Sequence, residues 1–112
     1  MYQIYGISNC DTVKKARKHL ESLEIEFEFH DFKKAPPTKA LISRWKEKLG
    51  ELPLNKKSRT YREHKETYDG LSASKKVDML IDQSSLIKRP LLEKNNKPIT
   101  MGYSKDEYEQ LS

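Results

Sequence analysis

A single cysteine, Cys10, is the side chain of this sequence best suited to covalent chemistry. It lies between Asn9 and the pair Asp11–Thr12, where a strand-like segment passes into a helical pattern. In the first turn of a helix, unpaired N–H groups and the helix dipole stabilise an anion. A thiolate held there is a nucleophile near neutral pH. The Asp11 carboxylate repels a thiolate at Cys10, unless its side chain caps the helix and faces away from the sulfur. The other interpretation of Cys10 is a small buried hydrophobic residue.

The spacing around Cys10 excludes several other cysteine chemistries. A phosphatase-type loop needs arginine as the sixth residue after the cysteine, and that residue is Ala16. A Cys-x-x-Cys redox pair fails at Val13, and one cysteine forms no internal disulfide, which favours a cytoplasmic protein. We expect no metal site, because the three histidines lack the spacing of metal ligands. These histidines fit surface or strand-edge positions: His19, His30 and His64. We also expect no tightly bound cofactor.

The dipeptide Arg89–Pro90 is the second informative feature. A proline is tolerated at the start of a strand, and the sequence leaves open whether the bond before it is cis. If this strand start faces the first helix, Arg89 approaches Cys10 and favours the thiolate or binds an anionic substrate. The alternative is an arginine on a solvated turn.

Apolar spacing and turn residues divide the chain into strands and helices. Val13, Ala16 and Leu20 recur at helical spacing, whereas Phe27 and Phe29 alternate with polar residues as in a strand. The predicted strands cover residues 2–7, 25–30, 86–93 and 98–102, and the predicted helices cover 13–23, 39–49, 60–68, 71–81 and 104–110. The last two strands form a hairpin around Asn95–Asn96.

This order predicts an α/β fold in one domain over residues 1–112. A β-α-β unit gives a parallel strand pair with a right-handed crossover, and the hairpin completes a mixed sheet of four strands. Helices inserted at about 38–84 interrupt the order. The arrangement is that of a thioredoxin-like sheet with a helical insertion.

Composition restricts the partners only loosely. The 22 Lys and Arg exceed the 17 Asp and Glu, for a formal charge of +5. The basic residues are scattered rather than gathered on one element, and no nucleic-acid motif is present, so we expect no specific nucleic-acid partner. No apolar run approaches a membrane span and no signal peptide is apparent. We expect a cytoplasmic monomer.

Two motifs and three shorter stretches resemble the arsenate-reductase-like (ArsC/Spx) family, and within it the YffB-like subgroup. The similarity spans essentially the whole chain. It is carried by these segments: Tyr5–Ala16, Leu54–Lys57, Thr60–Arg62, Ser85–Pro90 and Gly102–Ser104.

The resemblance implies a thioredoxin-like fold with an all-helical insertion, a nucleophilic Cys10, and a cis Arg89–Pro90 bond beside it. Members of the subgroup are described as glutathione-dependent thiol reductases, so glutathione is the expected co-substrate. The resemblance also implies a substrate site formed by residues around these two motifs: Asn9, Asp11, Thr12, Asn55, Pro90 and Gly102.

The departures from the family pattern argue against arsenate reduction. Arsenate reductases of the family hold the oxyanion with three arginines, and the matching positions here are Asn55, Arg89 and about Gly102. Our first hypothesis is therefore a monothiol reductase in which an external thiol clears the mixed disulfide. The second is an Spx-like regulator that contacts RNA polymerase without catalysis, favoured by the basic insertion from Lys56 to Lys76.

Overall fold

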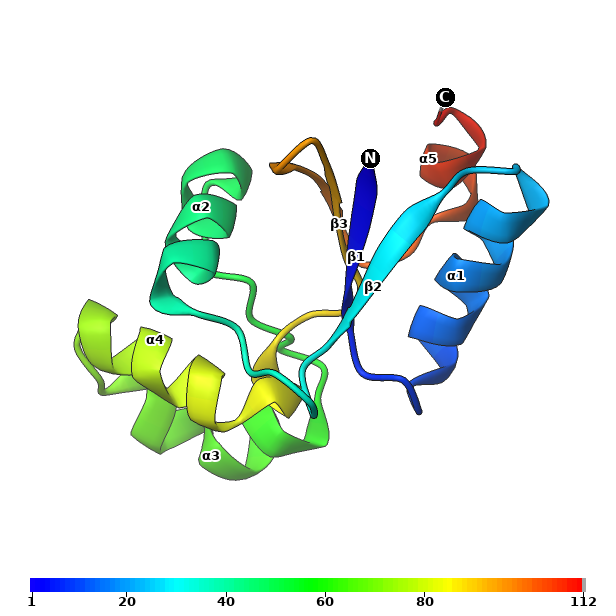
Figure 1. Cartoon of the computed structure of the whole chain (residues 1–112). Helices are drawn as coiled ribbons and strands as arrows, with labels where there is room; N and C mark the ends of the chain where they lie inside the picture. Colours follow the sequence, from blue (N-terminus) through cyan, green and yellow to red (C-terminus); the bar gives the residue numbers. More distant parts are fainter. Residues whose placement is uncertain (112) are drawn as a thin grey trace. The chain divides into compact units, whose positions relative to one another are not determined.

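The computed structural model describes residues 1–111, which fall into two compact units (Figure 1). The first contains residues 1–35 and the chain from Arg89 onward, and the second contains residues 36–88. The range expected for the helical insertion, about 38–84, lies within this second unit. The first unit contains β1 (Tyr2–Gly6), α1 (Asp11–Ser22), β2 (Phe27–Asp31), β3 (Leu91–Lys94), β4 (Lys97–Met101) and α5 (Lys105–Glu109). The second contains α2 (Lys39–Leu49), α3 (Arg59–Asp69), α4 (Ala73–Asp82) and the 3₁₀ turn η1 (Ser84–Leu86).

The first unit is built on a mixed sheet of four strands in the order β2-β1-β3-β4. β1 and β2 are parallel, with Tyr2 opposite Phe27, and α1 is the crossover between them. β3 runs antiparallel to both β1 and β4. The predicted α/β fold with a four-stranded mixed sheet is confirmed.

Helices α1 and α5 cover one face of this sheet (Figure 1). Val13, Ala16 and Leu20 of α1 are fully buried, as their helical spacing predicts. Leu20 and Ala16 share a core cluster with Ile4 of β1 and Tyr108 of α5. This packing holds the start of α1 at a defined place beside the end of β1.

The second unit is a set of three helices whose ends follow from local sequence. Thr38, Ser58 and Ser72 cap α2, α3 and α4, because each hydroxyl accepts a hydrogen bond from an N–H in the first turn. Gly50 ends α2 in the left-handed conformation with φ of 84°, which glycine adopts without steric cost. Trp45 of α2 is fully buried.

The apolar run from Leu86 divides at Pro90. Pro90 was expected at the start of a strand, and β3 begins directly after it at Leu91, whereas the residues from Leu86 do not extend that strand. Leu86 ends a 3₁₀ turn, and Ile87 forms an isolated bridge with Leu54 of the helical unit. The backbone of this segment pairs within the helical unit and is therefore not available to the sheet.

The hairpin turn itself is as predicted. Asn95 and Asn96 both have positive φ, 52° and 64°, as a two-residue turn between twisted strands requires.

Across the described residues, no helix has the length and apolar character needed to span a membrane.

Candidate active site at Cys10

Cys10 is the N-cap residue of α1. Its backbone is extended, its N–H donates to the carbonyl of Ile7 at 3.2 Å, and its carbonyl accepts from the N–H of Lys14 at 2.9 Å. The sulfur accepts no cap hydrogen bond, and the residue is half-buried. The first-turn amides of α1, from Asp11 to Val13, have no intrahelical acceptor. A half-buried cysteine thus lies at the start of the helix, next to the first-turn amides, and it is not one of the fully buried residues of the core.

Strand register brings a second group of predicted residues to the same edge of the sheet. Tyr5 lies opposite Leu91, and Leu91 lies opposite Met101. The residues just beyond these pairs are therefore neighbours at the end of β1 from which the chain runs to Cys10. Gly102 donates its N–H to the carbonyl of Pro90 at 2.8 Å and has a φ of 86°.

Arg89 and Pro90 immediately precede β3 at this edge. The bond between them is cis, as the family resemblance implied. Pro90 is buried and Arg89 is half-buried. The Arg89 guanidinium has no hydrogen bond or ion pair within residues 1–111, so its charge is available to an anion.

The other predicted site residues divide between the two units. Asn9, Asp11 and Thr12 flank Cys10, and all three are exposed. Asn55 belongs to the helical unit, where its N–H donates to the carbonyl of Leu86 at 2.7 Å. Its side chain accepts from the N–H of Lys57 at 3.2 Å. Asn55 thereby holds the turn that leads into α3.

One expectation about the histidines is wrong. His19 was predicted on the surface or at a strand edge, but its side chain in α1 is only 9% exposed. Its Nδ1 lies 2.7 Å from the hydroxyl of Tyr103, and its Nε2 lies 3.1 Å from a carboxylate oxygen of Glu109. This contact attaches α5 to α1. The position of residue 19 could have predicted this burial. It lies three residues after the buried Ala16, and therefore at the side of the apolar face of the helix.

His30 fits the prediction better. It lies in β2, an edge strand, and its ring stacks on that of Tyr5 with centroids 4.6 Å apart. In the part of the chain that the structure describes, no three His, Cys, Asp or Glu side chains are grouped to hold a metal ion.

Comparison with known proteins places the whole chain in one group. The sequence matches the ArsC family over residues 5–111. An uncharacterized protein of Haemophilus influenzae is 32% identical over 97% of this chain and 96% of its own length. The regulatory protein MgsR of Bacillus subtilis is 28% identical over 96% of this chain and 87% of its own length.

Solved structures agree with these sequence matches. The YFFB protein superposes with a TM-score of 0.86 at 33% identity, covering 97% of this chain and 96% of that one. An arsenate reductase (ArsC) related protein from Brucella melitensis has a TM-score of 0.72 at 33% identity, covering 96% and 91%.

Proposed function

Because this chain belongs to the ArsC family, we propose that it is a thiol–disulfide oxidoreductase with Cys10 as its nucleophile. The observation that carries the proposal is the placement of that cysteine. It is the only one in the sequence, it is half-exposed, and it caps α1 without using its sulfur in a cap hydrogen bond. The first-turn amides are thus available to a thiolate at this place.

The reaction is thiol–disulfide exchange in two steps. The Cys10 thiolate attacks one sulfur of a disulfide substrate, and the other sulfur leaves as a thiolate that takes a proton from water. Because the chain has no second cysteine, an external thiol must attack the sulfur bound to Cys10. That step forms a new disulfide outside the protein and regenerates the Cys10 thiolate. We propose glutathione as this external thiol.

Arg89 supplies positive charge to the same edge of the sheet. The residue is half-buried, and its guanidinium is free of protein partners among the described residues. In this proposal it stabilises the Cys10 thiolate or binds a carboxylate of glutathione. The peptide before Pro90 pairs with the tripeptide backbone, while Asn9 and Thr12 border the bound ligand. With one arginine in place of three, the site is not expected to reduce arsenate.

Oxidised glutathione provides the direct test. Incubation of the full chain, followed by intact mass, should show rapid stoichiometric addition at Cys10, reversed by excess reduced glutathione. We expect no addition to Cys10→Ser and a slowing on the order of tenfold in Arg89→Gln, which corresponds to about 1.4 kcal/mol. Lys88→Gln, an exposed neighbour, is the matched control. An equal slowing in both variants would remove Arg89 from the proposed site.

The alkylation rate of Cys10 at neutral pH tests the reactivity of the sulfur independently. A cysteine activated by its surroundings is alkylated faster than free cysteine under the same conditions. A rate no higher than that of free cysteine would contradict the reductase proposal. The measurement requires no knowledge of the substrate.

A second candidate function rests on the similarity to MgsR, a regulatory protein. In this alternative the chain binds RNA polymerase and Cys10 performs no catalysis. A pull-down from cell extract with Cys10→Ala separates the two. A variant that still retains polymerase in stoichiometric amount favours the regulator. A variant that has lost both polymerase binding and thiol–disulfide exchange favours the enzyme.

A further inference from the structure

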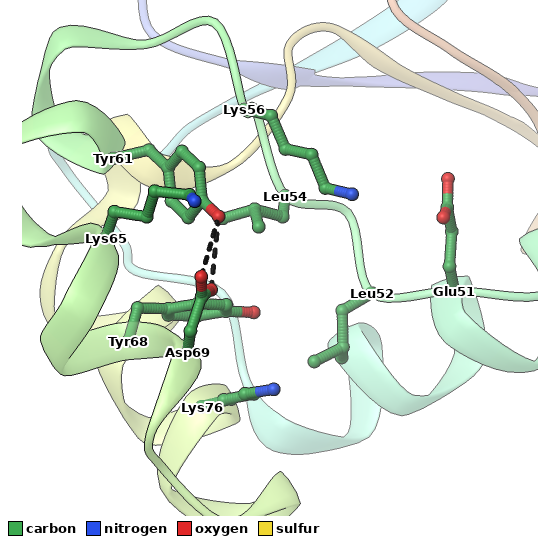
Figure 2. Close-up of a pocket in the computed structure, with 9 residues that line it drawn as sticks. All are labelled: Glu51, Leu52, Leu54, Lys56, Tyr61, Lys65, Tyr68, Asp69 and Lys76. Atoms are coloured by element: carbon green, nitrogen blue, oxygen red, sulfur yellow. Dashed lines mark hydrogen bonds between the residues drawn. The ribbon is translucent and has the colours of Figure 1, made fainter.

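The helical unit contains a pocket of about 630 Å³ that none of the Cys10-site residues lines (Figure 2). Its wall combines cationic, aromatic and aliphatic side chains. We call it the lysine–tyrosine pocket, and its lining residues are Glu51, Leu52, Leu54, Lys56, Tyr61, Lys65, Tyr68, Asp69 and Lys76.

Helix periodicity explains why α3 contributes so much of this wall. Tyr61, Lys65, Tyr68 and Asp69 stand at relative positions 0, 4, 7 and 8, which share one face of a helix. Lys76 comes from α4, and the remaining side chains come from the segment that joins α2 to α3. Three separate segments thus converge on one space.

The charges in the pocket are not balanced internally. Three lysines and two carboxylates line it. Asp69 is already an acceptor, since the hydroxyl of Tyr61 donates to its two oxygens at 3.1 and 3.3 Å. Within residues 1–111, neither Lys56 nor Lys65 has an ion pair or hydrogen bond from its ammonium group. Unpaired positive charge therefore faces the pocket.

The tyrosines add no negative charge to this environment at neutral pH. Burial is the main cause that raises the pKa of Tyr61 and of Tyr68, and Asp69 raises both further. Both groups thus remain neutral phenols. Lys76 lies over the Tyr68 ring, 5.4 Å from its centroid, which holds its ammonium at the wall. Figure 2 shows Lys56 and Lys76 approaching the space from opposite sides.

We propose that the lysine–tyrosine pocket binds a small organic phosphate, an anion that carries one or two phosphate groups on an apolar or planar body. Lysine ammonium groups are compact charges that pair with phosphate. Leu52, Leu54 and the edge of Tyr68 offer apolar contact to the rest of the ligand. A volume of about 630 Å³ lies within the range of small-molecule sites, about 300–1,000 Å³.

Titration of the full ¹⁵N-labelled chain with ADP at low ionic strength tests this proposal. Amide shifts should centre on residues 51–56 and 61–76. Adenosine, which lacks phosphate, and inorganic pyrophosphate, which lacks the apolar body, should each bind more weakly than ADP. Lys56→Gln and Lys65→Gln should each lower ADP affinity about two- to fivefold, the range for solvent-exposed charge pairs. Both lysines are exposed, so neither change threatens folding.

Lys57→Gln is the matched control, because Lys57 is exposed, adjacent in sequence and outside the pocket lining. An equal loss of affinity in this control would mean non-specific attraction and overturn the site. Shifts centred elsewhere, or no response to ADP at millimolar concentration, would overturn it too. Pyrophosphate that binds as tightly as ADP would show that the apolar body contributes nothing, and it would contradict the proposed class of small organic phosphates. A short single-stranded oligonucleotide that binds while ADP does not would contradict the same class.

Discussion

The contact between Gly6 and Val13 sets how closely α1 approaches the end of β1, and a substitution at Gly6 would measure it. A Cβ added at Gly6 would lie 2.7 Å from one γ-carbon of Val13 and 3.3 Å from the other. The first distance is shorter than real Cβ contacts, and Val13 is fully buried, so one element must move. We therefore expect Gly6→Ala to destabilise the protein by about 1–3 kcal/mol through overpacking.

The companion substitution Val13→Ala makes the magnitude testable. Alone it removes two buried methyl groups and should cost about 1.5–3 kcal/mol. It also removes the two atoms nearest the added Cβ, and the Val13 Cβ itself is 3.6 Å away, an ordinary contact. In that background Gly6→Ala should be neutral, or stabilising by up to about 1 kcal/mol because alanine restricts the unfolded chain. The coupling energy is then about 1–3 kcal/mol.

Urea unfolding followed by far-ultraviolet circular dichroism gives the free energy of unfolding of the four proteins in this double-mutant cycle: the unchanged chain, the two single variants and the double variant. A cost of Gly6→Ala that persists unchanged in the Val13→Ala background would refute the contact as its cause. Because Cys10 caps the helix that carries Val13, the alkylation rate is a second readout. Gly6→Ala should change that rate, and the double variant should restore it.

Three further predictions concern stability. Burial raises the pKa of Tyr108 above the ordinary value of about 10. The unfolded chain therefore loses this proton first, and stability falls as pH rises above about 10, by at most about 1.4 kcal/mol per pH unit; Tyr108→Phe should flatten that fall in urea titrations. Gly50→Ala should cost about 1–2 kcal/mol because of the positive φ, and Gly50→Asn less, as thermal unfolding would show. Thr38→Ala should cost about 1 kcal/mol by removing the bond from the N–H of Leu41 at 3.2 Å, whereas Thr38→Ser should retain most of it in the same measurement.

Most elements were predictable because their signals are local. Helical spacing alone predicts α1, through the apolar residues Val13, Ala16 and Leu20. The two ends of α2 are marked by Thr38 and Gly50. The residues before β3 were harder to assign. Pro90 marks the start of the strand, but the apolar run from Leu86 is also compatible with a strand, and only the pairing of Ile87 with Leu54 shows that the first residues of this run belong to the helical unit.

The candidate sites show the same division. The order of residues is enough to show that there is one cysteine, that it lies at the start of a helix, and that no second thiol within the chain could resolve a mixed disulfide. The neighbours of Cys10 follow from the folded chain, because strand register sets which residues meet at a sheet edge. Register brings Arg89 and Gly102, distant in sequence, to the end of β1. Likewise, helix packing gathers lysines from three segments around one pocket and places His19 between Tyr103 and Glu109. No spacing along the chain encodes these arrangements, because each depends on contacts between elements rather than within them.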